Sequence, residues 1–308
     1  MDQFRRHPRS TYDPQLGWII KPLAHERFFN SDEHSFRLAD PAPRPVPQNA
    51  ILAVGDSFTF GEEVNDNETW PAYLEIVTGT PVINAASGAW GTDQIAMRAE
   101  AVIDIAHPKI LIVDFYSNDV ERAEYQVLFG GEKPYYTIEA GELVLHNVPV
   151  PQVAMAKQIG LLRSVLGYSY TVFWLAQHLG YQQWLYGPFT EYKRATPEGT
   201  GAQITCLLLK RLKQRTEREG IRLLLVTQYA SQDFRGPKPS TMVAALDCAH
   251  GLGVEALDTW TRLAEIQAGD PARFAALYNL YRGVASHMSA AGNSLIADEI
   301  ARRLKGDD

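Results

Sequence analysis

Five short apolar runs separated by helical stretches constrain the fold of this chain more than any other feature of its sequence. Most are rich in Val, Ile or Leu, as is typical of strands that are buried on both faces. We predict the strands at Ile51–Val54, Val82–Ala85, Ile110–Phe115, Leu223–Thr227 and Val254–Leu257. Because buried strands that alternate with helices form parallel sheets, the sequence predicts an α/β fold with a five-stranded parallel sheet.

Helical patterns fill the intervals between the strands. They are clearest at Asp93–Ala106, at Ala202–Glu219 and at Ser289–Leu304. Ser289 suits an N-cap, because a serine side chain accepts a hydrogen bond from the first turn of a helix. Gly220 suits a helix end, so both boundaries agree with the apolar pattern.

Two regions depart from this alternation and set the predicted domain boundaries. Residues 1–49 are rich in Pro, His and charge, with the sequence PAPRPVP at residues 41–47. We predict that they form an extended arm packed on a domain of residues 50–308. The second region is a predicted insertion at about residues 125–190.

The insertion has two parts with different patterns. Tyr135–Val150 has two strand-like halves around an Ala-Gly pair and is predicted as a hairpin. Residues 153–186 are apolar and rich in aromatics, and we predict a helical segment packed on the domain. A membrane-surface helix over residues 159–186 and a lid over the site are the alternatives. Arg163 and His178 interrupt the stretch, so no transmembrane span is predicted.

Composition limits the classes of partner and cofactor. At 308 residues and 45% hydrophobic content, the chain can bury a full core. Its 36 acidic and 29 basic residues give a net charge of −7 without a basic block, which argues against a nucleic-acid partner. Cys206 and Cys248 lie in partly apolar helical segments with no metal-ligand spacing. We interpret both as core thiols and predict neither a disulfide nor a metal site.

The beginning of the sequence bears on localisation. Positive charge in MDQFRRHPRSTYDPQLGW is not followed by an apolar run, so no secretory signal is recognised. On this basis we predict a cytoplasmic protein. The periplasm or the cell surface is the alternative if the chain was trimmed from a longer one.

Polar residues follow the predicted strands at the edge where such sheets bind ligands. Ser57 follows the first strand, the turn NAASGAWG at residues 84–91 follows the second, Asn118 follows the third, and His287 precedes the last helix. A serine hydroxyl needs a base to become a nucleophile and N–H donors to hold the oxyanion that its attack creates. His287 is the candidate base. The backbone N–H of Ser57, the turn and the Asn118 amide are candidate donors.

In order and spacing, these motifs resemble those of the SGNH, or GDSL, hydrolase family over most of residues 50–304. Gly55-Asp56-Ser57 is similar to the first family block, the turn at residues 84–91 to the second, Asn118-Asp119 to the third and the segment around His287 to the fourth. The resemblance implies a three-layer α/β/α flavodoxin-like fold with strand order 2-1-3-4-5. It also implies that Ser57 is the nucleophile, His287 the base and Asn118 an oxyanion donor.

Three positions depart from the family pattern. Counting back from Thr92 places Ala89 at the position of the oxyanion glycine of the second block. The glycine itself, Gly88, lies one residue earlier. Tyr116 replaces the glycine of the third block and would narrow the pocket floor. Val284 stands where the family has the aspartate that orients the histidine. A backbone carbonyl or Asp258 could take over that role, although Asp258 also suits a helix cap.

Three more residues near these motifs are candidates for accessory roles: Asp56, Asp119 and Arg122. Arg122 could meet a carboxylate or hydroxyl of the substrate, or it could pair with a nearby acid.

We therefore predict a serine ester hydrolase that forms an acyl-enzyme and needs neither a metal nor an organic cofactor. The segments DPQLGW at residues 13–18 and DVER at residues 119–122 resemble a bacterial subset associated with the cell surface or exopolysaccharides. That resemblance implies O-acyl esters of a carbohydrate or small molecule as substrates. An O-acetyltransferase acting on a polysaccharide is one alternative. A catalytically silent carbohydrate-binding or scaffold protein is the other, motivated by Val284, and the oligomeric state stays open.

Overall fold

A parallel sheet of five strands forms the centre of the fold. The computed structural model describes residues 9–40, 42, 45–152, 166, 169–179, 191–281 and 283–306. In spatial order, the strands are β4 (Val82–Asn84), β3 (Ile51–Val54), β5 (Ile110–Tyr116), β11 (Arg222–Gln228) and β12 (Glu255–Asp258). All neighbours are parallel, and the order along the chain is 2-1-3-4-5. The predicted sheet is confirmed, with every strand boundary within one residue.

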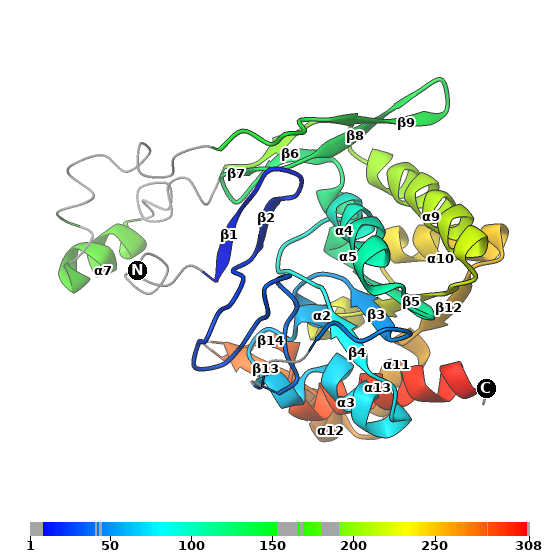
Figure 1. The fold of residues 1–308 in the computed structure, drawn as a ribbon. Helices are drawn as coiled ribbons and strands as arrows, with labels where there is room; N and C mark the ends of the chain where they lie inside the picture. Colours follow the sequence, from blue (N-terminus) through cyan, green and yellow to red (C-terminus); the bar gives the residue numbers. More distant parts are fainter. Residues whose placement is uncertain are drawn as a thin grey trace. The chain divides into compact units, whose positions relative to one another are not determined.

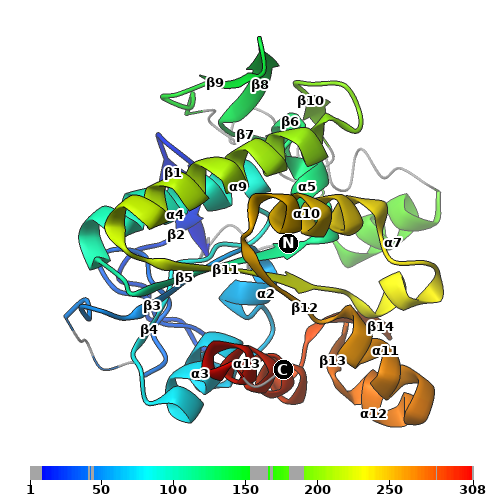
Figure 2. The same ribbon diagram turned by 90° about the vertical axis from the view of Figure 1, so that its right-hand side faces the viewer.

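Helices cover both faces of this sheet and make it the middle layer of three (Figures 1 and 2). One face carries α4 (Thr92–Ala106), α5 (Ser117–Arg122), α9 (Thr200–Glu219) and α10 (Ser240–Leu252). The other carries α3 (Trp70–Thr78), α11 (Trp260–Gly269) and α13 (Ala290–Lys305). The three-layer α/β/α prediction is confirmed, and the Ser289 side chain caps α13 as expected.

The apolar runs that predicted the inner strands β3, β5 and β11 are buried almost throughout, whereas the edge strand β12 is only half-buried. Every residue of Ile51–Val54 is at most 1% exposed, and Leu111, Ile112 and Val113 are fully buried. Burial of one such side chain stabilises the fold by about 1.5–3 kcal/mol. Strand β3 is therefore a continuous apolar run because neither of its faces meets water.

Short elements complete the part of the chain that contains the sheet. They are α2 (Ser57–Phe60), η1 (Asp66–Glu68), η4 (Ser231–Arg235), α12 (Pro271–Ala276), β13 (Tyr278–Tyr281) and β14 (Val284–Met288). β13 and β14 pair as an antiparallel hairpin that leads into α13. The sequence analysis did not predict this hairpin.

The chain divides into two structural units. The sheet and its helices belong to residues 22–123 and 199–306, whereas residues 9–21 and the described part of 124–198 form the other unit. The prediction of an arm at residues 1–49 stays a prediction.

The second unit is built mainly from short strands. They are β1 (Ser10–Asp13), β2 (Gly17–Ile20), β6 (Tyr125–Leu128), β7 (Gly131–Glu132), β8 (Tyr135–Glu139), β9 (Glu142–His146) and β10 (Lys193–Arg194). The antiparallel pair of β8 and β9 is the hairpin that the sequence predicts.

Most of the aromatic-rich segment at residues 153–186 lies outside the described residues. Its described part includes the helix α7 (Tyr170–His178). The membrane-surface helix and the lid over the site stay predictions. Among the described helices, none has both the length and the apolar character that crossing a membrane requires.

The two cysteines form a disulfide, and the prediction of two core thiols is wrong. Cys206 lies in α9 and Cys248 in α10, and their Cα atoms are 5.7 Å apart. This separation is typical of a disulfide. The pairing depends on how the two helices pack against each other, so the local sequence around either cysteine does not show it.

Candidate active site

Ser57 begins the short helix α2 directly after strand β3. The buried Asp56 carboxylate accepts a hydrogen bond from the Phe58 N–H at 2.8 Å and caps this helix. A Cβ atom at Gly55 would lie 2.1 Å from Thr59 Oγ1, so the turn requires glycine. The Gly-Asp-Ser sequence thus forms a tight turn that places Ser57 at the carboxyl end of the strand.

His287 lies within hydrogen-bond distance of Ser57. Its Nε2 atom is 3.0 Å from Ser57 Oγ, the separation that a nucleophile and its base need. β13 and β14 pair with a register shift, so that Ser286 and His287 oppose the single residue Asn279. Such a bulge changes the direction of side chains and is frequent next to active sites. The structure therefore brings together the predicted nucleophile and base.

A buried charge network adjoins the nucleophile. Asp56 Oδ2 is 3.2 Å from the Ser57 hydroxyl and 3.1 Å from Arg122 Nη1. Arg122 also donates to Asp119 Oδ1 at 2.7 Å and to the Trp90 carbonyl at 3.1 Å. Arg122 thus pairs with nearby acids, which is the second of the two roles that the sequence left open.

Burial governs how this network titrates. It raises the pKa of the Asp119 carboxyl well above its ordinary value, and the nearby Asp56 adds to this effect while Arg122 opposes it. Burial by itself would lower the pKa of the Arg122 guanidinium, but Asp119 and Asp56 outweigh it and raise that pKa. Arg122 is therefore a permanent cation that connects the turn before Ser57 to helix α5.

Gly88 lies beside the nucleophile. A Cβ atom built on Gly88 would be 3.8 Å from Ser57 Cβ. Ala89, the other candidate, has a left-handed backbone with φ of 65°. Asn118 lies exposed in the first turn of α5. Gly88 is thus adjacent to Ser57, and the choice between Gly88 and Ala89 as the second backbone donor stays a prediction.

Tyr116 occupies the position where the third sequence motif lacks its glycine. Its ring is 7% exposed and packs against Phe58 at a centroid distance of 4.9 Å. Burial raises the pKa of the Tyr116 hydroxyl to about 12, and the negative charge of Asp233 contributes. The phenol is therefore neutral near pH 7 and cannot replace His287 as a base.

Neither position 284 nor Asp258 supplies a group that orients His287. Val284 is 62% exposed at the start of β14. Asp258 accepts hydrogen bonds from Tyr229 Oη at 2.7 Å and from the Trp260 N–H at 3.1 Å, and it forms an ion pair with Lys238. Asp258 thus holds the first turn of α11, in line with the capping role that the sequence analysis also considered.

Glu63 is the acid that faces His287, and the sequence analysis did not single it out. Glu63 Oε1 is 3.6 Å from His287 Nδ1. Ser286 Oγ lies 3.2 Å from the same ring nitrogen and 2.9 Å from the same carboxylate oxygen. The only sequence signal for Glu63 is its closeness to Ser57 along the chain.

The described residues contain no group of three or more His, Cys, Asp or Glu side chains that could hold a metal ion.

Comparisons with known proteins give similarity in structure only. No protein-family model and no curated protein matches the sequence. Similar solved structures include lipolytic proteins of the G-D-S-L family, an esterase and a lipase/acylhydrolase.

Three of these structures illustrate the extent of the likeness. An esterase from Pseudoalteromonas is 12% identical with a TM-score of 0.44, over 84% of this chain and 98% of the esterase. A lipase/acylhydrolase from Enterococcus faecalis is 13% identical with a TM-score of 0.44, over 83% of this chain and 96% of the other. A G-D-S-L lipolytic protein from Veillonella parvula is 12% identical with a TM-score of 0.45, over 83% and 98% of the two chains.

Proposed function

We propose that this chain is a serine ester hydrolase of the SGNH, or GDSL, type. The observation that carries the proposal is the distance of 3.0 Å between Ser57 Oγ and His287 Nε2. The two residues are 230 positions apart in the sequence and form the nucleophile–base pair that acyl transfer requires. The topology of the sheet and the turn at Ser57 also support this assignment.

The mechanism proceeds in two halves. Ser57 Oγ attacks the ester carbonyl while His287 Nε2 takes the hydroxyl proton, and the same proton then goes to the departing alcohol. Water attacks the acyl-enzyme in the second half, with His287 again accepting a proton and returning it to Ser57. The backbone N–H groups of Ser57 and Gly88 and the Asn118 amide are the proposed donors to the oxyanion.

The proposed substrates are O-acyl esters of a carbohydrate or a small molecule. Support for a saccharide comes from the sequence resemblance to cell-surface and exopolysaccharide-associated hydrolases. Release of acetate from acetylated polysaccharides tests this part. If the acyl group instead moves to an added saccharide faster than to water, the protein is an O-acetyltransferase.

Hydrolysis of p-nitrophenyl acetate tests the proposed chemistry without knowledge of the natural substrate. We expect turnover by the wild type and a loss of about 10³-fold or more in kcat for both Ser57→Ala and His287→Ala. Circular dichroism verifies that each variant is folded. Undiminished activity in Ser57→Ala would exclude Ser57 as the nucleophile.

The disulfide supports the periplasm or the cell surface, which is the alternative to the predicted cytoplasm. Disulfides persist mainly in oxidising environments such as the periplasm and the cell surface. We therefore propose that the protein acts in such a compartment. Detection of two free thiols in protein isolated from its native cells would contradict this proposal.

A further inference from the structure

Glu63 and Ser286 form a directed hydrogen-bond chain behind His287. The Glu63 carboxylate can only accept hydrogen bonds, so the Ser286 hydroxyl donates a hydrogen bond to Glu63 Oε1 at a distance of 2.9 Å. Ser286 Oγ can then only accept from His287 Nδ1, which is 3.2 Å away. This order places the imidazole proton on Nδ1 and leaves Nε2 free to take the proton of Ser57.

Charge reinforces this arrangement. During turnover His287 becomes an imidazolium, and the Glu63 carboxylate at 3.6 Å from Nδ1 stabilises that positive charge. The two side chains are 26% and 28% exposed, so solvent weakens the interaction relative to a fully buried pair.

The backbone at Glu63 is held in a conformation that glutamate rarely adopts. Its φ is 69°, in the left-handed region that favours Gly, Asn and Asp. The Asn279 side chain donates to the Glu63 carbonyl at 3.3 Å and to the Met288 carbonyl at 3.3 Å. Asn279 therefore ties Glu63 to the hairpin that carries His287. Unfavourable backbone conformations of this kind are frequent at functional sites.

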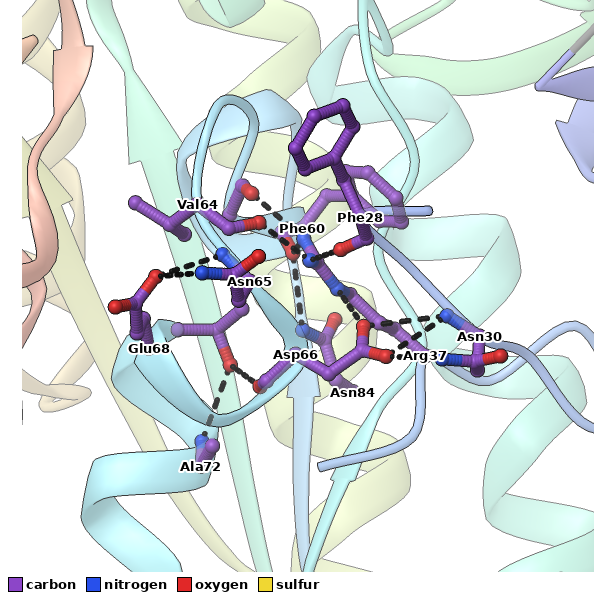
Figure 3. A network of polar contacts seen from close by, with 12 residues as sticks. Phe28, Asn30, Arg37, Phe60, Val64, Asn65, Asp66, Glu68, Ala72 and Asn84 are labelled. Carbon is purple, nitrogen blue, oxygen red and sulfur yellow. Dashed lines mark hydrogen bonds and ion pairs between the residues drawn. The ribbon is translucent and has the colours of Figure 1, made fainter. Parts of the chain in front are cut away.

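Arg37 anchors the loop that contains Glu63, and Figure 3 shows its contacts with Phe60, Val64 and Asp66. Its guanidinium donates to the carbonyls of Phe60 at 2.8 Å, Gly61 at 2.6 Å and Val64 at 2.8 Å. It also pairs with Asp66 at 2.9 Å, and the Arg37 side chain is only 2% exposed. The loop is thus anchored on both sides of Glu63.

We infer that Glu63 is the positioning acid of the site. It takes over the role of the aspartate that orients the histidine in the family and that is missing at position 284. It acts through His287: with Ser286 it selects the Nδ1-protonated tautomer, and its charge stabilises the imidazolium. This inference rests on the proposed ester hydrolysis. It also removes the motive for a catalytically silent protein, because the loss of an acid at Val284 is compensated from another loop.

The first test compares Glu63→Gln with Glu62→Gln in the hydrolysis of p-nitrophenyl acetate. Both variants remove one negative charge, from adjacent residues. We expect Glu63→Gln to lower kcat by about 10- to 100-fold with little change in KM, less than the ~10⁴-fold of a buried triad aspartate because the pair is partly exposed. Glu62→Gln should stay within about twofold of the wild type.

The second test separates positioning from a structural role. Asn at position 63 suits the left-handed backbone but is too short to replace the carboxylate. We expect Glu63→Asn to be at least as resistant to urea as the wild type and yet to have a kcat reduced at least as much as in Glu63→Gln. In ¹⁵N-histidine NMR at a pH where His287 is neutral, the Nδ1-protonated signal should dominate in the wild type and weaken in Glu63→Asn. His287→Ala assigns this signal.

The outcomes distinguish this inference from the proposed function. If the wild type hydrolyses the ester and Glu63→Gln matches it in kcat, Glu63 has no positioning role, although the hydrolase proposal stands. If the wild type is inactive, the hydrolase proposal fails, and the NMR comparison still decides whether Glu63 sets the tautomer. An unchanged His287 signal in Glu63→Asn would overturn the inference.

Discussion

Gly55 is necessary for the position of Ser57, because the turn has no room for a side chain there. In Gly55→Ala the new Cβ would lie 2.1 Å from Thr59 Oγ1 and 3.0 Å from the Asp114 carbonyl. Overpacking of a buried site costs about 1–3 kcal/mol, so we expect a lower free energy of unfolding and a loss of esterase activity. Urea denaturation and p-nitrophenyl acetate hydrolysis measure both effects.

The control for this variant is Gly251→Ala in helix α10. A Cβ atom at position 251 would have nothing within 4 Å, and alanine favours a helix by about 1 kcal/mol over glycine. We expect this variant to be at least as stable as the wild type. Equal destabilisation by the two substitutions would contradict a specific steric requirement at Gly55.

Asp114 makes stability depend on pH. Burial is the largest cause that raises the pKa of its carboxyl to about 7, so the folded protein retains this proton while the unfolded chain, with an ordinary carboxyl pKa of about 3.9, loses it. The contribution of this group is fully present below about pH 4 and is lost as the pH rises to about 7, on the order of 4 kcal/mol.

Asp114→Asn should remove this pH dependence. Asparagine is uncharged at every pH, so we expect the difference in unfolding free energy between Asp114→Asn and the wild type to shift in favour of the variant from pH 4 to pH 7. Urea denaturation across this range measures it. A difference that is constant with pH would show that Asp114 ionises normally in the folded protein.

The residues of the site differ in how far sequence could predict them. Ser57 and His287 lie in local motifs whose neighbours mark them, and the structure brings them together as predicted. Glu63 has no such motif, because its role arises from a contact with a hairpin far away in the sequence. The sequence at position 284 shows only that the usual acid is missing. The structure is needed to identify Glu63 as the acid next to His287.

The loop between α2 and η1 depends on the buried pair of Arg37 and Asp66. The two side chains are 2% and 10% exposed, so removing one partner leaves the other buried and uncompensated. We expect Arg37→Met to lower the free energy of unfolding by about 3–5 kcal/mol and to reduce kcat, because Glu63 loses its anchored loop. Urea denaturation and ester hydrolysis provide the measurements.

A double variant checks this explanation. Arg37→Met with Asp66→Asn removes both charges, so it should be more stable than Arg37→Met alone although kcat stays low. If the two single effects on stability simply add, the ion pair does not couple these residues.

The disulfide should stabilise the packing of α9 against α10. It closes a loop of sequence separation 42, and a disulfide of this kind typically contributes about 2–4 kcal/mol. We expect Cys206→Ser with Cys248→Ser to lower the unfolding free energy by that amount. Titration of thiols in the denatured, unreduced protein provides the control. Two free thiols in that assay would show that the disulfide is absent.

The elements also differ in how well the sequence predicted them. The inner strands β3, β5 and β11 contain buried apolar runs that mark them in the sequence, and the boundaries of all five strands agree with the prediction within one residue. The hairpin of β13 and β14 is half exposed and has an irregular register, so it lacks both an apolar run and a regular alternation. The disulfide escaped prediction because it joins two helices whose packing the local sequence does not specify.

At the scale of the sheet-containing unit, the parallel topology brings three of the candidate residues to one edge of the sheet. Ser57, Gly88 and Asn118 follow three different strands, and the carboxyl ends of parallel strands meet at one edge of the sheet. The hairpin before α13 adds His287 from near the other end of the chain. Order along the sequence could therefore predict the nucleophile and its base, but not the group that orients the base.

Labelling with a fluorophosphonate probe tests the central claim most directly, because the probe reacts with a serine only when a base activates it. The account predicts that wild-type protein is labelled and that peptide mapping finds the probe on Ser57. Neither Ser57→Ala nor His287→Ala should be labelled at a comparable rate. Folded wild-type protein that stays unlabelled, or equal labelling of His287→Ala, would contradict an activated Ser57–His287 pair.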